Sequence, residues 1–285
     1  MSPLQKFTLL TAGALVALAF WSFTASQNAP SLVGAWQLVD ESGGSEQTTW
    51  VFAEDYMSKT TFDIANKVFV GTKGGRYYGS NTAISEIREF DTWNPENALN
   101  EQVYEIVWGE DPDRITVICG RCEDKSSQVW QRIDDGRAPL AGAWQITKRM
   151  QEGEMREIHR TGSRKTVKLL SGTRFQWIAI DPDKKGFYGT GGGSYTFEDG
   201  VYTENIEFFS RDSSRVGMSL SFQGAVSGND WSHSGKSSKG KPINAVIKSS
   251  VVKLPGRCAS ASYITNKYSE EAQAIKPNMM SKTGT

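Results

Sequence analysis

The chain has 285 residues, a length that accommodates about two domains. Its 32 basic and 32 acidic side chains give a formal net charge of zero, so no overall field draws it toward nucleic acid or an anionic membrane. An apolar fraction of 38% is too low for a multispan membrane protein, and 28 glycines with nine tryptophans favour an all-β fold with tight turns.

The N-terminal part contains an apolar segment, residues 7–25, in which only Thr and Ser interrupt the apolar side chains. Such a segment is typical of an export signal cleaved near residue 26. It is also just long enough to cross a bilayer as an uncleaved anchor, and the two readings stay open. Residues 1–26 therefore predict an extracytoplasmic protein, which is periplasmic, secreted or attached to a membrane through residues 7–25.

Most of the remaining chain repeats one pattern. Residues 32–39 (LVGAWQLV) match residues 140–147 (LAGAWQIT). Residues 69–90 align with residues 187–208, within the stretch 187–209, at a constant separation of 118 residues. Repetition of this kind indicates two copies of one small β domain.

The two copies are predicted to span residues 31–136 and 139–255. Short alternating segments at close spacing predict about nine strands in each copy, as in a sandwich or barrel. The second copy has about ten extra residues near 150–163, expected to form a longer loop or one helical turn. In each copy a glycine-rich segment, residues 71–75 or 189–194, is expected to be the turn between two strands.

Three cysteines and a polar tail remain. Cys119 and Cys122 have C-x-x-C spacing, but no helix pattern follows them, so a thioredoxin-type redox motif lacks its context. A local disulfide and two idle thiols are both open, and Cys258 is left over. Neither a second cysteine pair nor a histidine pair is present to complete a zinc site. Residues 256–285 have no strand pattern and are predicted to be largely disordered or partly docked on the second copy.

A G-x-W motif stands at the start of a predicted strand in each copy, at residues 34–36 and 142–144. This resembles the calycins, the superfamily of lipocalins, fatty-acid-binding proteins and avidins, in which that glycine and tryptophan close one end of a barrel. The resemblance implies an all-β chain of two tandem lipocalin-like antiparallel β-barrels. It also implies a basic residue of the last strand above each indole. The implied pairs are Trp36 with Arg132 and Trp144 with Lys248.

The second copy is also similar to lipocalin-like domains of exported bacterial proteins that are described only as membrane or secreted proteins of unknown function. The similarity covers residues 173–242 and includes FYGTGGG at 187–193 and YTENIEFFSRD at 202–212. It implies a fold and transfers no catalytic residue.

An aromatic set in the second copy is expected to line a ligand pocket. Tyr202, Glu204, Ile206 and Phe208 alternate along one predicted strand and are expected to share a face. A buried Glu204 carboxylate would need a cation such as Arg174 or Arg211. A basic loop at residues 236–241 is able to attract an anionic head group. The candidate ligand-binding residues are Phe175, Trp177, Tyr188, Tyr195, Tyr202, Glu204, Phe208 and Arg211.

The sequence therefore predicts a non-catalytic protein that binds an apolar or amphipathic small molecule, without nucleic acid, metal or cofactor. Haem held by His233 is an alternative, since some calycin-like barrels bind haem through one histidine. Two further hypotheses stay open. One is a scaffold whose filled barrels bind another envelope protein, and the other is an isomerase or hydrolase that uses Glu204 with Arg211.

Overall fold

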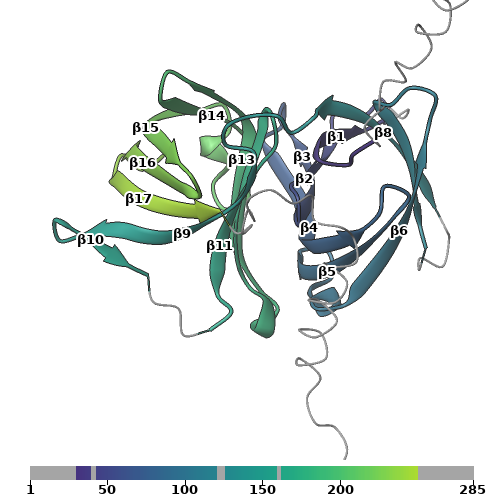
Figure 1. Ribbon diagram of the computed structural model, residues 1–285, viewed down its shortest axis with the longest axis horizontal. Coiled ribbons are helices and arrows are strands. Elements are labelled where there is room, and N and C mark those ends of the chain that lie inside the picture. The colour runs from purple at the N-terminus through teal and green to yellow at the C-terminus, as the bar shows by residue number, and fades with distance from the viewer. Residues whose placement is uncertain (1–29, 40–42, 121–125, 159–161, 250–285) are drawn as a thin grey trace, which may run out of the picture. The chain divides into compact units, whose positions relative to one another are not determined.

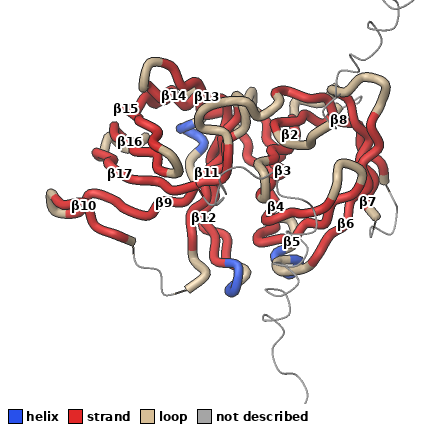
Figure 2. The backbone as a smooth tube through the Cα atoms, in the orientation of Figure 1, coloured by secondary structure: helices blue, strands red, loops and turns tan. Residues whose placement is uncertain are grey.

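A computed structural model describes residues 30–39, 43–120, 126–158 and 162–249 (Figures 1 and 2). Within these residues, no helix is long and apolar enough to cross a membrane. Several predicted features lie outside the described residues: the export segment, Cys122, Cys258, the outer part of the insertion at 159–161, and the tail at 256–285.

Barrel 1 is a closed antiparallel barrel of eight strands in sequential order. The strands are β1 (Gly34–Leu38), β2 (Gln47–Phe52), β3 (Tyr56–Asp63), β4 (Val68–Gly79), β5 (Ala83–Asp91), β6 (Glu101–Trp108), β7 (Arg114–Cys119) and β8 (Ser127–Asp134). The ring closes because β1 pairs with β8. A single 3-10 turn, η1 (Pro95–Asn97), follows β5.

Barrel 2 repeats this arrangement. Its strands are β9 (Gly142–Gln151), β11 (Lys165–Leu170), β12 (Arg174–Asp181), β13 (Gly186–Glu198), β14 (Val201–Phe209), β15 (Ser219–Ser227), β16 (Asp230–Lys236) and β17 (Pro242–Ser249), with the 3-10 turns η2 (Pro182–Lys184) and η3 (Ser213–Arg215). The ring closes because β9 pairs with β17. The prediction of an all-β chain with two antiparallel barrels is therefore confirmed.

The insertion in the second copy forms a β-hairpin. The additional strand β10 (Glu154–Glu157) pairs with the outer end of β9, and both strands project beyond the barrel wall in Figure 1. The expected longer loop or helical turn is wrong in the described part of the insertion. The outer end of β9 can accept a partner here because β11 pairs with this edge of β9 only as far as Gln145.

The two glycine-rich segments lie inside long strands, so the prediction that they form turns is wrong. β4 and β13 run unbroken through them. Each strand has a β-bulge there, at Gly74/Gly75 and at Gly192/Gly193. A Cβ atom on Gly192 would lie 2.5 Å from the Phe175 carbonyl oxygen, so the neighbouring backbone approaches too closely for a side chain. Each copy consequently has eight barrel strands instead of about nine.

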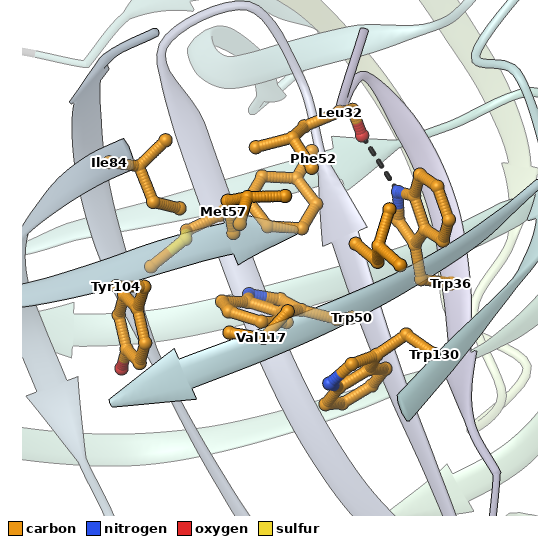
Figure 3. Close-up of a cluster of buried hydrophobic side chains, with 11 residues drawn as sticks. Leu32, Trp36, Trp50, Phe52, Met57, Ile84, Tyr104, Val117 and Trp130 are labelled. Carbon is orange, nitrogen blue, oxygen red and sulfur yellow. Dashed lines mark hydrogen bonds between the residues drawn. The ribbon is translucent and has the colours of Figure 1, made fainter. Parts of the chain in front are cut away.

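Each barrel is filled by a cluster of buried side chains that includes the tryptophan of its G-x-W motif. In barrel 1, Trp36, Trp50 and Trp130 are almost completely buried, and Figure 3 shows them packed with Phe52 and Met57. The Trp36 indole Nε1 donates a hydrogen bond to the Leu32 carbonyl, 2.9 Å away, and Trp144 makes the matching bond to Leu140 at 2.8 Å. These bonds hold an indole under the same end of both barrels.

A third buried cluster joins the two barrels. Phe62 of barrel 1 packs against Phe208 of barrel 2 with 4.8 Å between ring centroids. The buried Gln176 side chain accepts a hydrogen bond from Thr60 at 3.0 Å and donates one to Thr72 at 3.1 Å. Lys165 also forms an ion pair with Glu89 at 2.7 Å. Strands of barrel 1 therefore pack directly against strands of barrel 2 through apolar, hydrogen-bonded and ionic contacts.

Cys119, at the end of β7, is disulfide-bonded. Its side chain is buried, and its Sγ lies 3.2 Å from the Gln102 amide nitrogen. The partner cysteine lies outside the described residues, so the choice between Cys122 and Cys258 stays open.

Candidate binding site

A buried ion pair stands at the centre of barrel 2. Lys168 on β11 and Glu204 on β14 both point into the barrel, and the Lys168 Nζ lies 2.5 Å from Glu204 Oε1. Lys168 is 9% exposed and Glu204 7%. The expectation that Arg174 or Arg211 neutralises Glu204 is therefore wrong. Arg174 instead donates two hydrogen bonds to the Glu207 carboxylate, of 2.9 and 2.5 Å.

Aromatic rings enclose this ion pair. The Lys168 Nζ lies 4.4 Å from the centroid of the Tyr202 ring and 5.0 Å from that of Trp231. A desolvated ammonium above aromatic faces is stabilised by the ring quadrupoles. Burial, together with the Glu204 carboxylate, raises the pKa of the Tyr202 hydroxyl well above its usual range. The centre of barrel 2 thus holds one charge of each sign and a neutral phenol.

His233 on β16 lies beside the pair. It is 6% exposed, and its ring is 4.2 Å from the Phe222 ring and 5.4 Å from Trp231, centroid to centroid. Burial, and to a lesser degree the charge of Lys168, lowers its pKa to about 3, so the imidazole is neutral at physiological pH. Neither ring nitrogen has a hydrogen-bond partner within the described residues.

The structure places the predicted ligand-binding residues in different parts of barrel 2. Phe175, Tyr195 and Tyr202 belong to the packed core of barrel 2, and Trp177 packs against it. Tyr188 lies under the guanidinium of Arg164, with 4.2 Å between Arg164 Cζ and the ring centroid. The set therefore does not form one pocket wall.

Phe208 and Arg211 lie away from the interior. The bulge in β13–β14 places Gly193 opposite Ile206 and Gly192 opposite Phe208, so Glu207 is an extra residue. This reverses the alternation, and Phe208 packs against barrel 1 instead of sharing a face with Glu204. Arg211 is exposed. Glu204 and Arg211 do not converge, so the arrangement required by the isomerase or hydrolase hypothesis is absent from the described structure.

A cavity of about 870 Å³ opens at the end of barrel 2 opposite the Trp144 indole. It is lined by the outer part of β9, the starts of β11 and β17, and the segment around η2. Its apolar lining residues are Ile146, Met150, Ile158, Pro242, Ile243 and Ala245. Thr166 also lines it and stands two residues before Lys168, so the cavity ends just above the packed core.

Cationic side chains outnumber acidic ones around the cavity. The cations are Arg149, Arg164, Lys165 and Lys184, and the acids are Asp181 and Asp183. The Asp181 carboxylate is already engaged, because the Ser163 hydroxyl donates to it and Lys184 lies 3.9 Å away. Lys165 is likewise engaged, by Glu89, so the positive excess of the rim above the apolar wall comes from Arg149 and Arg164, which outnumber Asp183.

Sequence reasoning missed Lys168 and the arginines of the rim. The repeat contains a signal for Lys168, since the residue 118 positions earlier is Trp50, a core residue of barrel 1. A charged residue aligned with a core tryptophan indicates an interior charge. The arginines of the rim have no comparable signal, because Arg164 lies in a loop and Arg149 near the hairpin insertion.

The two pairs predicted at the closed ends are placed differently. Arg132 Cζ lies 4.1 Å from the centroid of the Trp36 ring, and its Nη1 donates to the Val33 carbonyl at 3.1 Å. In barrel 2 the residue opposite Trp144 is Ser249, and Lys248 is opposite Gln145. The Lys248 Nζ instead lies 3.8 Å from Asp230 on the exposed surface. The expected contact of Lys248 with Trp144 is therefore out of register by one residue.

His233 does not line the cavity, and the imidazole is enclosed by Phe222, Trp231 and Tyr202. Haem held by His233 stays a prediction to which this arrangement adds no support. No cluster of three metal-ligating side chains occurs among the residues that the structure describes.

No family model matches the chain, and no curated protein is significantly similar to it.

Proposed function

We propose that this protein is a calycin-like binding protein that holds an amphipathic small molecule, with an anionic head group, in the open end of barrel 2. The observation behind the proposal is the cavity of about 870 Å³ that combines an apolar wall with a cationic rim. Ligand pockets of roughly 300–1,000 Å³ suit molecules of drug size. The prediction of export, if correct, places this binding outside the cytoplasm.

The geometry limits the shape of the ligand. Below the cavity, the interior is filled by Tyr202, Phe222 and Trp231, which are 0–3% exposed. A long chain therefore finds no continuous tunnel through the barrel. The apolar part would contact Ile146 and Ile243 near the mouth, and the head group would face Arg149 and Arg164. Such a ligand is compact or remains partly exposed.

Calorimetric titration with dodecanoate, dodecanol and dodecyltrimethylammonium tests the proposal on the full chain. These probes share one apolar chain and differ in charge. We expect dodecanoate to bind more tightly than dodecanol and the cationic probe not to bind. Arg149→Gln should weaken dodecanoate binding by about tenfold, the effect of losing roughly 1.4 kcal/mol of interaction.

The matched control is Arg137→Gln, which removes one positive charge from a side chain that is 84% exposed in the linker between the barrels. It should leave dodecanoate binding unchanged. Failure of all three probes to bind, or equal weakening by both substitutions, would contradict the proposal.

The filled interiors support a second candidate, a scaffold that binds another protein. Both barrels contain a continuous buried cluster, which a carrier with an interior tunnel would lack. The hairpin β9–β10 gives this candidate a surface, since Met150 and Met155 lie opposite each other on it and are 41% and 38% exposed. If Met155→Ser, at a residue outside the cavity lining, leaves dodecanoate binding intact but abolishes recovery of a crosslinked envelope protein, the scaffold candidate is supported.

A further inference from the structure

The interior of barrel 1 contains more cations than its acids neutralise. Lys59 on β3 and Lys73 on β4 are directly opposite in the strand register, so their side chains share one face. The Lys59 Nζ lies 5.1 Å from the centroid of Trp130 and 5.8 Å from that of Trp50, both core residues. This face is therefore the interior of the barrel.

The acids inside barrel 1 are already bound. Arg88 donates to Glu86 Oε2 and to Asp91 Oδ2, both at 3.0 Å, and Tyr104 donates to Glu86 at 2.9 Å. The other Asp91 oxygen accepts the backbone N–H groups of Trp93 and Asn94, each at 3.0 Å. Glu86 and Asp91 are thus fully occupied by Arg88, Tyr104 and the backbone.

The two lysines have no carboxylate of their own. Within the described residues, neither Lys59 nor Lys73 forms a salt bridge, and the hydrogen bond of Lys59 goes to the neutral Gln128 amide oxygen at 2.8 Å. Burial and the neighbouring Lys73 lower the pKa of Lys59 to about 7, and burial with the charge of Arg88 lowers the pKa of Lys73. Partly buried cations that face each other without a counter-charge are unfavourable.

We propose that a small oxyanion, such as inorganic phosphate, binds between Lys59 and Lys73 inside barrel 1. It would supply the counter-charge that the chain itself does not provide, through charge-assisted hydrogen bonds from both ammonium groups. Trp93 marks the entrance. Its indole lies against Gly71 and is 46% exposed, and the Lys73 Nζ lies 5.8 Å from its centroid. The core below, with Trp50 and Trp130, has no space for an apolar tail.

This site differs from the cavity of barrel 2 and does not depend on the function proposed for it. The anion is small because Lys59 lies directly above the packed indoles of Trp50 and Trp130. It is an oxyanion because ammonium groups recognise concentrated negative charge through several N–H donors. A lipid phosphate and a free phosphate share this chemistry, and the experiment below separates them.

Nuclear magnetic resonance of the full chain labelled with ¹³C-lysine tests the proposal, because the ¹³Cε signal of each unmodified lysine gives its own pH titration. Lys59→Arg and Lys73→Arg assign the two signals. Inorganic phosphate should raise the pKa of Lys59 and of Lys73, since a bound anion favours the protonated amines. The variants serve only for assignment, and the titration itself is measured on the wild-type chain. Unchanged titration of both signals at saturating phosphate would overturn the proposal.

Calorimetry of phosphate binding supplies the second readout. Lys73→Met should weaken phosphate binding by about tenfold or more, while Arg137→Gln should have no effect. Loss of binding in Arg149→Gln, with binding kept in Lys73→Met, would move the anion to barrel 2 and contradict the proposal. A shift of the Lys59 signal by vesicles containing phosphatidate, but not by free phosphate, would identify a lipid head group and would equally overturn it.

Discussion

Barrels 1 and 2 bury a glutamate at the same position and neutralise it with cations from different strands. Glu86 and Glu204 are 118 residues apart and are 1% and 7% exposed. Glu86 is bound by Arg88, two residues further along the same strand. Glu204 is bound by Lys168, from a strand on another part of the ring. The repeat therefore preserves the buried carboxylate but not its partner.

The exchange of partners changes the chemistry of each interior. The residue that corresponds to Lys168 is Trp50, and the residue that corresponds to Arg88 is Ile206. Barrel 1 thus has an indole where barrel 2 has an ammonium group, and it has Lys59 and Lys73 in addition to its neutralised arginine. Two copies with one backbone design can consequently select different ligands, because the fold is set by the strands and the interior by a few side chains.

The largest predicted effect comes from breaking the pair in barrel 2. Lys168→Met leaves the Glu204 carboxylate buried without its cation, which should lower the free energy of unfolding by about 3–5 kcal/mol. Urea unfolding followed by tryptophan fluorescence and circular dichroism measures it. The double variant Lys168→Met with Glu204→Leu should recover most of the loss, since both charges are then gone. A loss below about 1 kcal/mol for Lys168→Met would show that Glu204 is effectively solvated.

The second prediction uses His233. Its counterpart in barrel 1 by strand register is Val117, because His233 is opposite Gly224 and Val117 is opposite Ile106, 118 residues before Gly224. The folded pKa of His233 is about 3, below its ordinary value of 6.5, so the unfolded chain binds more protons between these values. Stability should therefore fall as pH decreases from about 6.5 to about 3, by at most about 1.4 kcal/mol per pH unit from this group. Unfolding measured across this range should show a weaker pH dependence in His233→Val than in the wild type.

The smallest predicted effect concerns the closed ends. Arg132→Ser gives barrel 1 the residue that barrel 2 has opposite its tryptophan, and it removes the contact with Trp36. We expect a loss of about 1–2 kcal/mol in thermal or urea unfolding. Lys248→Ala, on the exposed side of the last strand of barrel 2, should change stability by no more than about 0.5 kcal/mol. Equal losses would contradict the register described for Lys248.

Two errors of the sequence interpretation, the placement of Phe208 and the glycine-rich turns, originate in the β-bulges. A bulge inserts a residue into one strand and reverses which side chains face inward. Strict alternation therefore placed Phe208 beside Glu204, whereas the extra residue Glu207 turns Phe208 toward barrel 1. The same bulges explain the glycine-rich segments, where the glycines permit a close approach of two strands and were mistaken for turns.

The sequence by itself determined that the chain contains two copies of one all-β unit, because a repeat of paired motifs at a constant separation is visible without any structure. It also indicated which tryptophans lie under the barrel ends. Only the tertiary structure decided that Lys168 meets Glu204, that Lys59 faces Lys73, and that the cavity opens beside Arg149 and Arg164. The physical reason is that these contacts join strands whose relative register depends on bulges and ring closure, which local patterns of side chains do not encode.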